Sequence, residues 1–394
     1  MTKALWLTSW YPNNQDAMRG DFIQRHARAV ALFCRVDVIH LEPDTNNELK
    51  QSVEISKNQQ GNLSETIVIY KLYKLPLIGK LFSLIKYIRL FQQQLRNYIV
   101  AYGKPDIVHV HVPMKAGILA WWLKSRYGLP YVVTEHWAIY NNNAVDAYPN
   151  RNFLFKYVTR KIIENASAFL PVSKNLGEAV QQMVASVYFT AVPNVADTKF
   201  FNNDSFKATL ETDFTFVHVS TLNYQKNPEG ILRAFLKIST QYPKVKLAIV
   251  GEHPEPLIAY AASIGINENN ILFTGLKSYE AVAAILKQCH VLVMFSRYEN
   301  LPCVIIEALC CGLPVISTDV GGIPEMINDS NGILIGKEDE DALYNAMQQL
   351  YTNFNNYNKT AIADSAENIY SYQAIGKRVT GIYDGIISKP AEKQ

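Results

Sequence analysis

Residues 297–312 decide the fold of this chain, and their sequence is RYENLPCVIIEALCCG. They follow an apolar run, residues 290–295, of the kind that forms a buried parallel strand. Pro302 suits the first turn of a helix, because its missing N–H costs nothing there. Gly312 suits the position just after a helix end, and the following Leu313-Pro314 prevents continuation. The segment therefore predicts a strand, a loop and a helix, in that order.

Two glutamates lie eight positions apart in this unit, Glu299 in the loop and Glu307 in the helix. The loop follows the carboxyl end of a strand, where open α/β sheets bind ligands, and it precedes a helix N-terminus, whose free amides attract anions. A carboxylate suits the diol of a sugar, because it accepts two charge-assisted hydrogen bonds. The spacing alone also fits a second interpretation, in which Glu299 caps the helix and Glu307 is a solvated helix residue.

The unit resembles the Glu-x7-Glu signature of retaining glycosyltransferases of family 4, which have the GT-B fold. The resemblance implies that Glu299 contacts hydroxyls of the donor sugar and that Glu307 holds the ribose of the sugar nucleotide. It also implies that the loop amides of Asn300 and Leu301 hold the pyrophosphate. The implied α/β fold has two Rossmann-like domains that face each other across a cleft, and a C-terminal helix that crosses back to the first domain.

The segment after the predicted strand 215–220 resembles the same family. Lys226 matches a lysine that clamps the pyrophosphate, so we expect it to bind the donor and to act in catalysis. The family usually has an arginine beside this lysine, but its position falls on Thr221, which leaves one less positive charge for the leaving group. Arg297 and Arg19 are candidates to replace it. A solvated lysine at the start of a helix is the alternative for Lys226.

Glycines after two further strands continue the resemblance. It implies that Gly251 borders the nucleotide and that Gly275 lies near the base. It also implies that Gly321 and Gly322 permit a tight turn under the donor, whereas we expect Glu325 to have a structural role.

Gly20 belongs to the polar turn between the first predicted strand, residues 4–8, and a helix that begins near Phe22. In the family, a glycine of this loop lets the backbone approach the donor phosphates. Gly20 as an ordinary turn residue or helix entry explains the sequence equally well. The loop lacks the pattern Gly-x-Gly-x-x-Gly, which disfavours a nicotinamide dinucleotide site.

Two strand-end histidines are further candidates. His136 follows the predicted strand 131–135, and the resemblance places it beside the reacting sugar and the acceptor, as a catalytic residue. His111 is a weaker candidate, because His109 and His111 also fit ordinary strand residues. Neither belongs to a set of ligands with the usual metal spacing, so we predict no metal site and no cofactor.

The segment 71–104 has an unusual charge pattern, with seven basic residues and no acidic one. Its apolar residues recur at helical spacing. A basic amphipathic helix of this kind can lie on an anionic membrane surface. The alternative is that the apolar stripe packs on the sheet while the basic side chains are solvated. The apolar residues are Leu77, Leu81, Leu84, Ile85, Ile88, Phe91 and Leu95.

The length of 394 residues indicates two domains. We expect residues 1–197, with the C-terminal helix of about 370–394, to bind the acceptor, and residues 198–369 to bind the nucleotide sugar. The net charge of +3 is too small to indicate a nucleic-acid partner. The five cysteines lack metal spacing and suit a reducing compartment. Without a signal-peptide pattern or a membrane-spanning run, we expect a cytoplasmic protein, peripheral to the inner membrane face if segment 71–104 binds lipid.

The resemblance implies a retaining hexosyltransferase of polysaccharide biosynthesis. Its donor would be a UDP- or GDP-sugar, and its acceptor a hydroxyl of a glycan or a lipid-linked glycan. The departing diphosphate would be stabilised by Lys226, the loop amides and the helix dipole. Two alternatives stay open: a GT-B sugar-nucleotide epimerase or phosphorylase, and a non-catalytic GT-B binding subunit, which Thr221 in place of arginine would suit.

Overall fold

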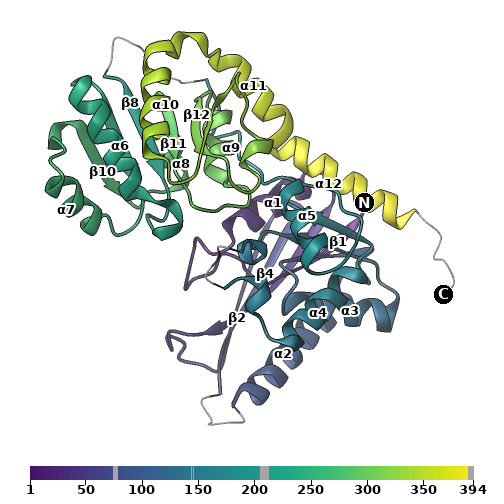
Figure 1. The fold of residues 1–394 in the computed structure, drawn as a ribbon. Helices are drawn as coiled ribbons and strands as arrows, with labels where there is room; N and C mark the ends of the chain where they lie inside the picture. The colour runs from purple at the N-terminus through teal and green to yellow at the C-terminus, as the bar shows by residue number, and fades with distance from the viewer. Residues whose placement is uncertain (74–78, 143, 145, 205–212, 389–394) are drawn as a thin grey trace.

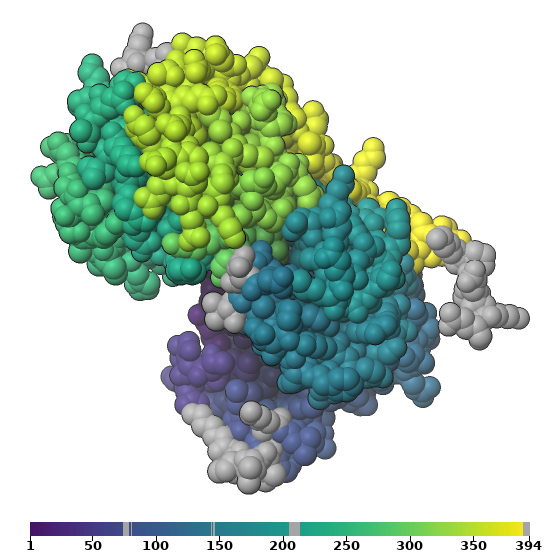
Figure 2. Space-filling model, in the orientation of Figure 1, coloured from purple at the N-terminus to yellow at the C-terminus, as the bar shows by residue number. Residues whose placement is uncertain are grey.

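Two β-sheets, each flanked by helices, form the two lobes of the molecule (Figure 1). The computed structural model describes residues 1–73, 79–142, 144, 146–204 and 213–388. In the space-filling view the C-terminal segment, in yellow, lies along the lobe built by the first half of the chain (Figure 2). The predicted pair of Rossmann-like domains with a returning C-terminal helix is confirmed.

The first sheet has seven strands in the order β3-β4-β2-β1-β5-β6-β7. Its neighbouring strands are parallel except β3 and β4, which form an antiparallel hairpin. The strands are β1 (Lys3–Thr8), β2 (Arg35–Asp44), β3 (Val53–Gln60), β4 (Leu63–Lys71), β5 (Ile107–His111), β6 (Tyr131–Glu135) and β7 (Ala168–Pro171).

Helices cover both faces of this sheet. They are α1 (Asp21–Ala31), α2 (Gly79–Tyr102), α3 (Ala116–Tyr127), α4 (Phe153–Glu164), α5 (Lys174–Met183) and α12 (Tyr372–Ile387). In β1, Leu5 and Leu7 enter the core with α2, α3 and α4, whereas Ala4 and Trp6 enter the core with α1 and α12. Successive strand residues point to opposite faces, so a continuous apolar run such as this one is buried on both sides.

The second sheet has six parallel strands in the order β10-β9-β8-β11-β12-β13. Helices α6, α7 and α10 share one core with it, and α8, α9 and α11 share the other. The strands are β8 (Thr215–Val219), β9 (Lys246–Val250), β10 (Ile271–Gly275), β11 (Val291–Met294), β12 (Val315–Thr318) and β13 (Gly332–Ile335). The helices are α6 (Pro228–Gln241), α7 (Glu255–Ser263), α8 (Tyr279–Leu286), α9 (Cys303–Cys310), α10 (Glu340–Asn353) and α11 (Lys359–Tyr370).

The strand order of the second sheet positions the site. From β8 the chain proceeds outward through β9 and β10, and it then returns to β11 on the other side of β8. The loops that follow β8 and β11 therefore leave the same edge of the sheet as neighbours. Ligands of open α/β sheets bind at such a switch point. The first loop holds Lys226 and the second holds Glu299.

The C-terminal helix packs back on the first lobe as expected. A Cβ atom on Gly376 of α12 would lie 2.8 Å from the carbonyl carbon of Ala29 in α1, so a glycine is needed for this close approach. Residues 389–394 of the predicted helix lie outside the described residues. The domain boundary predicted between residues 197 and 198 falls between β7 and β8 and stays a prediction.

Helix α2 contains most of the predicted amphipathic segment and has two environments. Phe91 and Leu95 are buried in the core, whereas Leu81 and Leu84 are 57% and 51% exposed. Packing on the sheet therefore explains only the C-terminal half of the helix. Residues 74–78 of the segment lie outside the described residues. Among the helices that the structure describes, none combines the length and the apolarity needed to cross a membrane.

Two elements were not predicted from the sequence. The polar residues after β2 contain β3, whose side chains are mostly exposed because it is an edge strand. Helix α11 packs against α9, and a Cβ atom on Gly312 would lie 2.7 Å from the carbonyl oxygen of Lys359 in α11. Six 3₁₀ turns complete the described elements: Ala138–Tyr140, Tyr148–Asn150, Tyr224–Lys226, Glu268–Asn270, Ile323–Glu325 and Phe354–Asn356.

Candidate functional site

Glu299 lies in a buried polar cluster just after β11. Its side chain is about 6% exposed, and Oε1 accepts a hydrogen bond of 2.8 Å from Oγ of Ser296. The same oxygen forms an ion pair with Nζ of Lys226. The neighbouring Gln225 donates a hydrogen bond of 2.9 Å from Nε2 to the carbonyl oxygen of Tyr298. The two loops of the switch point are thus tied together, and they bring the two predicted residues into direct contact.

Glu307 is buried in α9 and is paired with a residue of the first lobe. Its Oε1 accepts hydrogen bonds of 2.7 Å from Nη1 of Arg25 and 2.8 Å from the hydroxyl of Tyr279. Burial raises the pKa of Glu307, and the charge of Arg25 opposes that shift by stabilising the carboxylate. Glu307 is therefore not a solvated helix residue, and the N-cap of α9 is Pro302 rather than Glu299. The second interpretation, in which Glu299 caps the helix and Glu307 is solvated, is therefore wrong for both glutamates.

The residues after Glu299 connect the two lobes. Nδ2 of Asn300 donates a hydrogen bond of 2.7 Å to the carbonyl oxygen of His136, which follows β6. The carbonyl oxygen of Leu301 accepts one of 2.7 Å from Nδ2 of Asn194. The loop that is expected to bind the donor is thus held to the first lobe by two hydrogen bonds, each from an asparagine side chain to a backbone carbonyl.

The loop after β12 packs against the loop that holds Glu299. Gly321 has a φ of +59°, and the N–H of Gly322 donates a hydrogen bond of 2.7 Å to the carbonyl oxygen of Asn300. A Cβ atom on Gly322 would lie 2.6 Å from Cβ of Ser173, which no side chain would permit. Glu325 accepts hydrogen bonds of 2.9 Å from the amides of Lys174 and Asn175 at the start of α5, which is the structural role expected for it.

The three other predicted glycines occupy loops at strand ends. Gly20 has a φ of +70° at the start of α1, and a Cβ atom there would lie 2.8 Å from the carbonyl carbon of Trp10. Gly251 follows β9 and is crowded by Ser220 and Leu222, whereas Gly275 ends β10 with a φ of +70°. Local backbone geometry explains Gly20 without a ligand, so the donor contacts of these glycines stay predictions.

Arg297 and Arg19, the two candidates to replace the missing family arginine, each have a partner of their own. Arg297 donates a hydrogen bond of 2.9 Å to Glu338 and stacks on Tyr224, and Arg19 pairs with Glu42 at 3.3 Å. Arg25 is the guanidinium that contacts a predicted donor residue, because it bonds Glu307. Arg25 and Tyr279 were not predicted from the sequence. Their only local signal is the i,i+4 spacing of Asp21 and Arg25, which form an ion pair of 2.7 Å on α1.

Three histidines from separate elements meet beside Asn300. Nδ1 of His111 lies 3.1 Å from Nε2 of His136, and His26 of α1 completes the cluster. One ring nitrogen from each residue lies within 4.8 Å of the others, so the cluster could hold a metal ion. The usual metal spacing places ligands close together in the chain, whereas these residues are far apart in the chain and are brought together by tertiary structure. Both predicted histidines belong to the cluster, and His26 was missed.

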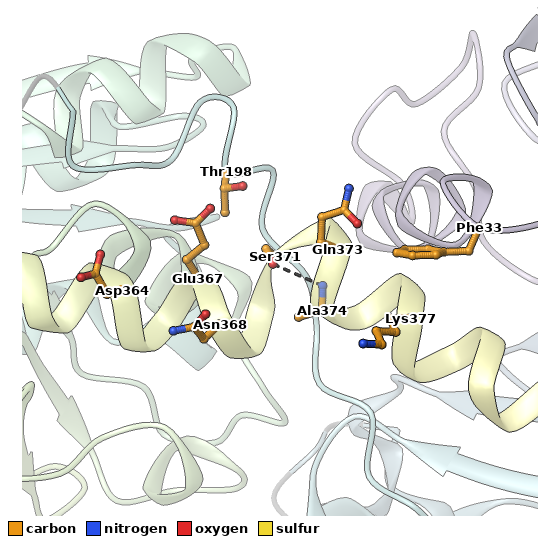
Figure 3. A pocket seen from close by; sticks show the side chains of 9 residues that line it. All are labelled: Phe33, Thr198, Asp364, Glu367, Asn368, Ser371, Gln373, Ala374 and Lys377. Carbon is orange, nitrogen blue, oxygen red and sulfur yellow. Dashed lines mark hydrogen bonds between the residues drawn. The ribbon is translucent and has the colours of Figure 1, made fainter.

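A cavity of about 880 Å³ lies elsewhere. Figure 3 shows it at the junction of α11 and α12, where Glu367 and Gln373 line it together with Thr198 of the connecting segment. None of the predicted site residues lines it. We therefore place the candidate site at the switch point and not in this cavity.

Two family models match the chain. Residues 20–200 match the model described as Glycosyltransferase Family 4, and residues 200–364 match the model described as Glycosyl transferases group 1. The two matches together span residues 20–364, which include every predicted site residue.

Curated relatives give the same result. The chain is 28% identical to N-acetyl-alpha-D-glucosaminyl L-malate synthase of Bacillus anthracis, over 56% of this chain and 58% of that protein. It is also 28% identical to a phosphatidylinositol N-acetylglucosaminyltransferase subunit of Schizosaccharomyces pombe, over 51% of this chain and 44% of that protein. The chain thus spans about half the length of these two relatives. The putative teichuronic acid biosynthesis glycosyltransferase TuaC of Bacillus subtilis is 23% identical over 88% of both chains.

Solved structures show the same fold. Sucrose-phosphate synthase of Thermosynechococcus elongatus superposes with a TM-score of 0.74 at 19% identity, covering 98% of this chain and 99% of that one. HepE of Anabaena in complex with UDP superposes with a TM-score of 0.72 at 16% identity, covering 98% and 100%. The site geometry, the two family models and the shared fold agree, and the chain therefore belongs to family 4 of the glycosyltransferases, with the GT-B fold.

Proposed function

We propose that this protein transfers a sugar from a UDP- or GDP-sugar to a hydroxyl group of a glycan or a lipid-linked glycan, with retention of the anomeric configuration. The observation that carries the proposal is the ion pair of Glu299 and Lys226 at the switch point of the second sheet. Family membership supports the class of reaction, and the UDP complex of HepE supports the class of donor.

In this proposal the two glutamates bind opposite ends of the donor. Glu299 accepts hydrogen bonds from hydroxyls of the sugar, and Glu307 accepts them from the ribose. Arg25 and Tyr279 both bond Oε1 of Glu307, so we assign Oε2 to the ribose. The charge of Arg25 favours the ionised form of this buried carboxylate, which is the form that binds a diol best.

The leaving diphosphate is stabilised by positive charge at the same place. Lys226 exchanges Glu299 for the diphosphate when the donor binds, and the amides at the start of α9 point towards it. The bond between the sugar C1 and the diphosphate oxygen breaks, and the acceptor oxygen bonds C1 on the same face. The acceptor proton passes to the departing diphosphate oxygen. Orientation of the two substrates and stabilisation of that oxygen supply the catalysis.

The acceptor side is formed by the first lobe, with His136 adjacent to the donor loop through its hydrogen bond from Asn300. We assign the membrane contact to the N-terminal half of α2, where Leu81 and Leu84 are exposed. An apolar cavity of about 220 Å³ between α2 and α3 lies beside them and is bordered by Lys115. Apolar side chains with nearby lysines suit an anionic lipid surface. The protein would then work at the cytoplasmic face of a membrane.

A thermal-shift screen tests the donor first. The protein is heated with UDP, GDP or ADP and with their common sugar conjugates, without metal. A ligand that binds only the folded state raises the melting temperature by mass action. We expect the melting temperature to rise with either the uridine nucleotides or the guanosine nucleotides. Transfer of a labelled sugar to a lipid-linked or soluble glycan is then measured with the matching donor.

The same assay separates the alternatives. An altered sugar nucleotide formed without any acceptor would indicate an epimerase, and a product that requires phosphate would indicate a phosphorylase. Binding of a donor with no turnover on any acceptor would support a non-catalytic subunit. Failure of every nucleotide to raise the melting temperature would contradict the proposal.

A further inference from the structure

The ring nitrogens of His26, His111 and His136 lie close to one another in a cluster that the proposed reaction does not use. One ring nitrogen of each residue lies within 4.8 Å of the others, and Nδ1 of His111 lies 3.1 Å from Nε2 of His136. His111 is fully buried, His26 is 2% exposed, and His136 is partly exposed at the edge of the cluster.

We propose that these three histidines bind a divalent transition-metal ion of the Zn²⁺ type. Imidazole is a preferred ligand of such ions, and three histidines with an open fourth position form a common zinc site. The open position would face the side on which His136 reaches the surface. Metal binding here does not depend on the proposed transfer reaction.

The distances between the rings fit such a site. Tetrahedral Zn²⁺ with bonds of about 2.0–2.1 Å holds neighbouring ligand nitrogens about 3.3 Å apart and ring centroids about 5 Å apart. Nδ1 of His111 and Nε2 of His136 are 3.1 Å apart. The centroid of His136 lies 5.4 Å from those of His26 and His111, and the remaining pair is 6.0 Å apart. Small rotations of the rings would complete the coordination.

A backbone contact of His26 fixes the tautomer that this residue needs to bind an ion. Nε2 of His26 lies 3.1 Å from the carbonyl oxygen of Pro193, and a carbonyl only accepts, so this nitrogen carries the proton and Nδ1 offers a lone pair. The ion would replace the proton shared by His111 and His136, and that proton would move to the outer nitrogen of its own ring. A backbone carbonyl behind a ligating histidine is the usual orienting contact of zinc sites.

Occupation of the site would inhibit the proposed transfer. The carbonyl oxygen of His136 accepts the hydrogen bond from Asn300, and an ion on the ring would fix this residue beside the donor loop and fill the acceptor side. Micromolar Zn²⁺ would then act as an inhibitor that a chelator reverses.

Equilibrium binding tests the site without reference to activity. The chelator-treated protein is titrated with Co²⁺, whose visible bands report four-coordinate binding, and Zn²⁺ is then added in competition. We expect one equivalent of Co²⁺ to bind and Zn²⁺ to displace it. Absence of visible bands, or binding without saturation at one equivalent, would overturn the proposal.

Matched variants locate the ion. His26→Ala and His136→Ala should each weaken Zn²⁺ binding by about tenfold or more, since even orienting residues of zinc sites matter by about 10–100-fold. Two variants are used because His26 is buried and its loss can disturb folding, which melting curves without metal would reveal. The control is the exposed His253, replaced by Asn because its backbone φ is +46°. Binding that both cluster variants retain, or that His253→Asn removes, would overturn the site.

Discussion

Nη1 of Arg25 donates a hydrogen bond of 2.7 Å to Oε1 of Glu307, and this contact joins α1 of the first lobe to α9 of the second. Both side chains are 7% exposed. The residue expected to hold the ribose is therefore oriented by the opposite domain. This buried ion pair is one of the contacts that join the two lobes at the donor site, and it gives the first prediction.

Replacing Arg25 with Met should lower the free energy of unfolding by about 3–5 kcal/mol, because it leaves the carboxylate of Glu307 buried and unpaired. Urea unfolding measures the change. Arg28→Met on the same helix is the control, and it should change stability by less than about 0.5 kcal/mol because Arg28 is exposed. Adding Glu307→Gln to Arg25→Met should recover part of the loss. Equal effects of the two arginine variants would contradict the role of the ion pair.

Replacing Glu299 with Ala or Gln should reduce transfer by about 100- to 1000-fold, the range found when a preorganised polar contact to a reacting group is lost. The fold should be retained, since the residue lies in a loop at the sheet edge. Initial rates at saturating donor measure the effect. Glu338→Gln removes a carboxylate that is 55% exposed and serves as the control. Near-normal transfer by the Glu299 variants would remove this residue from the site.

Lys226→Met should weaken binding of a nucleoside diphosphate by about 10- to 100-fold, which corresponds to one lost charged hydrogen bond of about 1.5–3 kcal/mol. The affinity for the nucleoside without phosphates should stay unchanged, because Lys226 is expected to contact the diphosphate. Calorimetry with the nucleoside diphosphate and with the nucleoside separates the contribution of the phosphates to the binding free energy from that of the nucleoside. Lys237→Met is the matched control, since Lys237 pairs with Asp341 on the surface. A parallel loss of nucleoside affinity would show that the substitution disturbs the whole site.

Glu135 predicts a pH dependence of stability. Its buried carboxylate accepts hydrogen bonds of 2.8 and 2.9 Å from the amides of His136 and Trp137. Burial raises the pKa of Glu135 from 4.5 to about 7, although these bonds oppose the shift. The folded state therefore binds more protons than the unfolded state between these values, and the resulting stability is full below the lower pKa and lost as the pH rises through the higher one.

Unfolding in urea at several pH values from about 4.5 to 8 checks this sign. The wild type should lose about 1–3 kcal/mol more than Glu135→Gln across the window, because a glutamine does not titrate. The amide oxygen of glutamine can still accept the two backbone hydrogen bonds. Parallel stability curves for the two proteins would show that folding does not change the pKa of Glu135.

The exposed leucines of α2 predict membrane binding. Leu81→Glu with Leu84→Glu should reduce co-sedimentation with anionic phospholipid vesicles by about tenfold or more, since it removes apolar contact and adds negative charge. Leu272→Glu on the edge strand β10 is the control, because Leu272 is 61% exposed in the other lobe. Equal binding of all variants, or no binding by the wild type, would confine the protein to soluble acceptors.

The order of strands and helices around Glu299 could be predicted because each signal is local. An apolar run, a proline and a glycine specify a strand, a helix start and a helix end within a few residues. Strand β3 was not predicted, since its polar residues show no alternation of apolar and polar side chains that would distinguish them from a loop. Helix α11 was missed because its apolar face is explained only by the presence of α9.

The sequence by itself determined the chemistry available at the site: two glutamates at a fixed spacing, a lysine after β8 and glycines where the backbone must turn. Only the tertiary structure decided which partners these groups meet. Arg25 reaches Glu307 because the two lobes pack together, and His26 reaches His111 and His136 because α1 packs on the first sheet. Side-chain spacing along a chain specifies neighbours within an element, whereas contacts between lobes depend on how buried apolar faces fit.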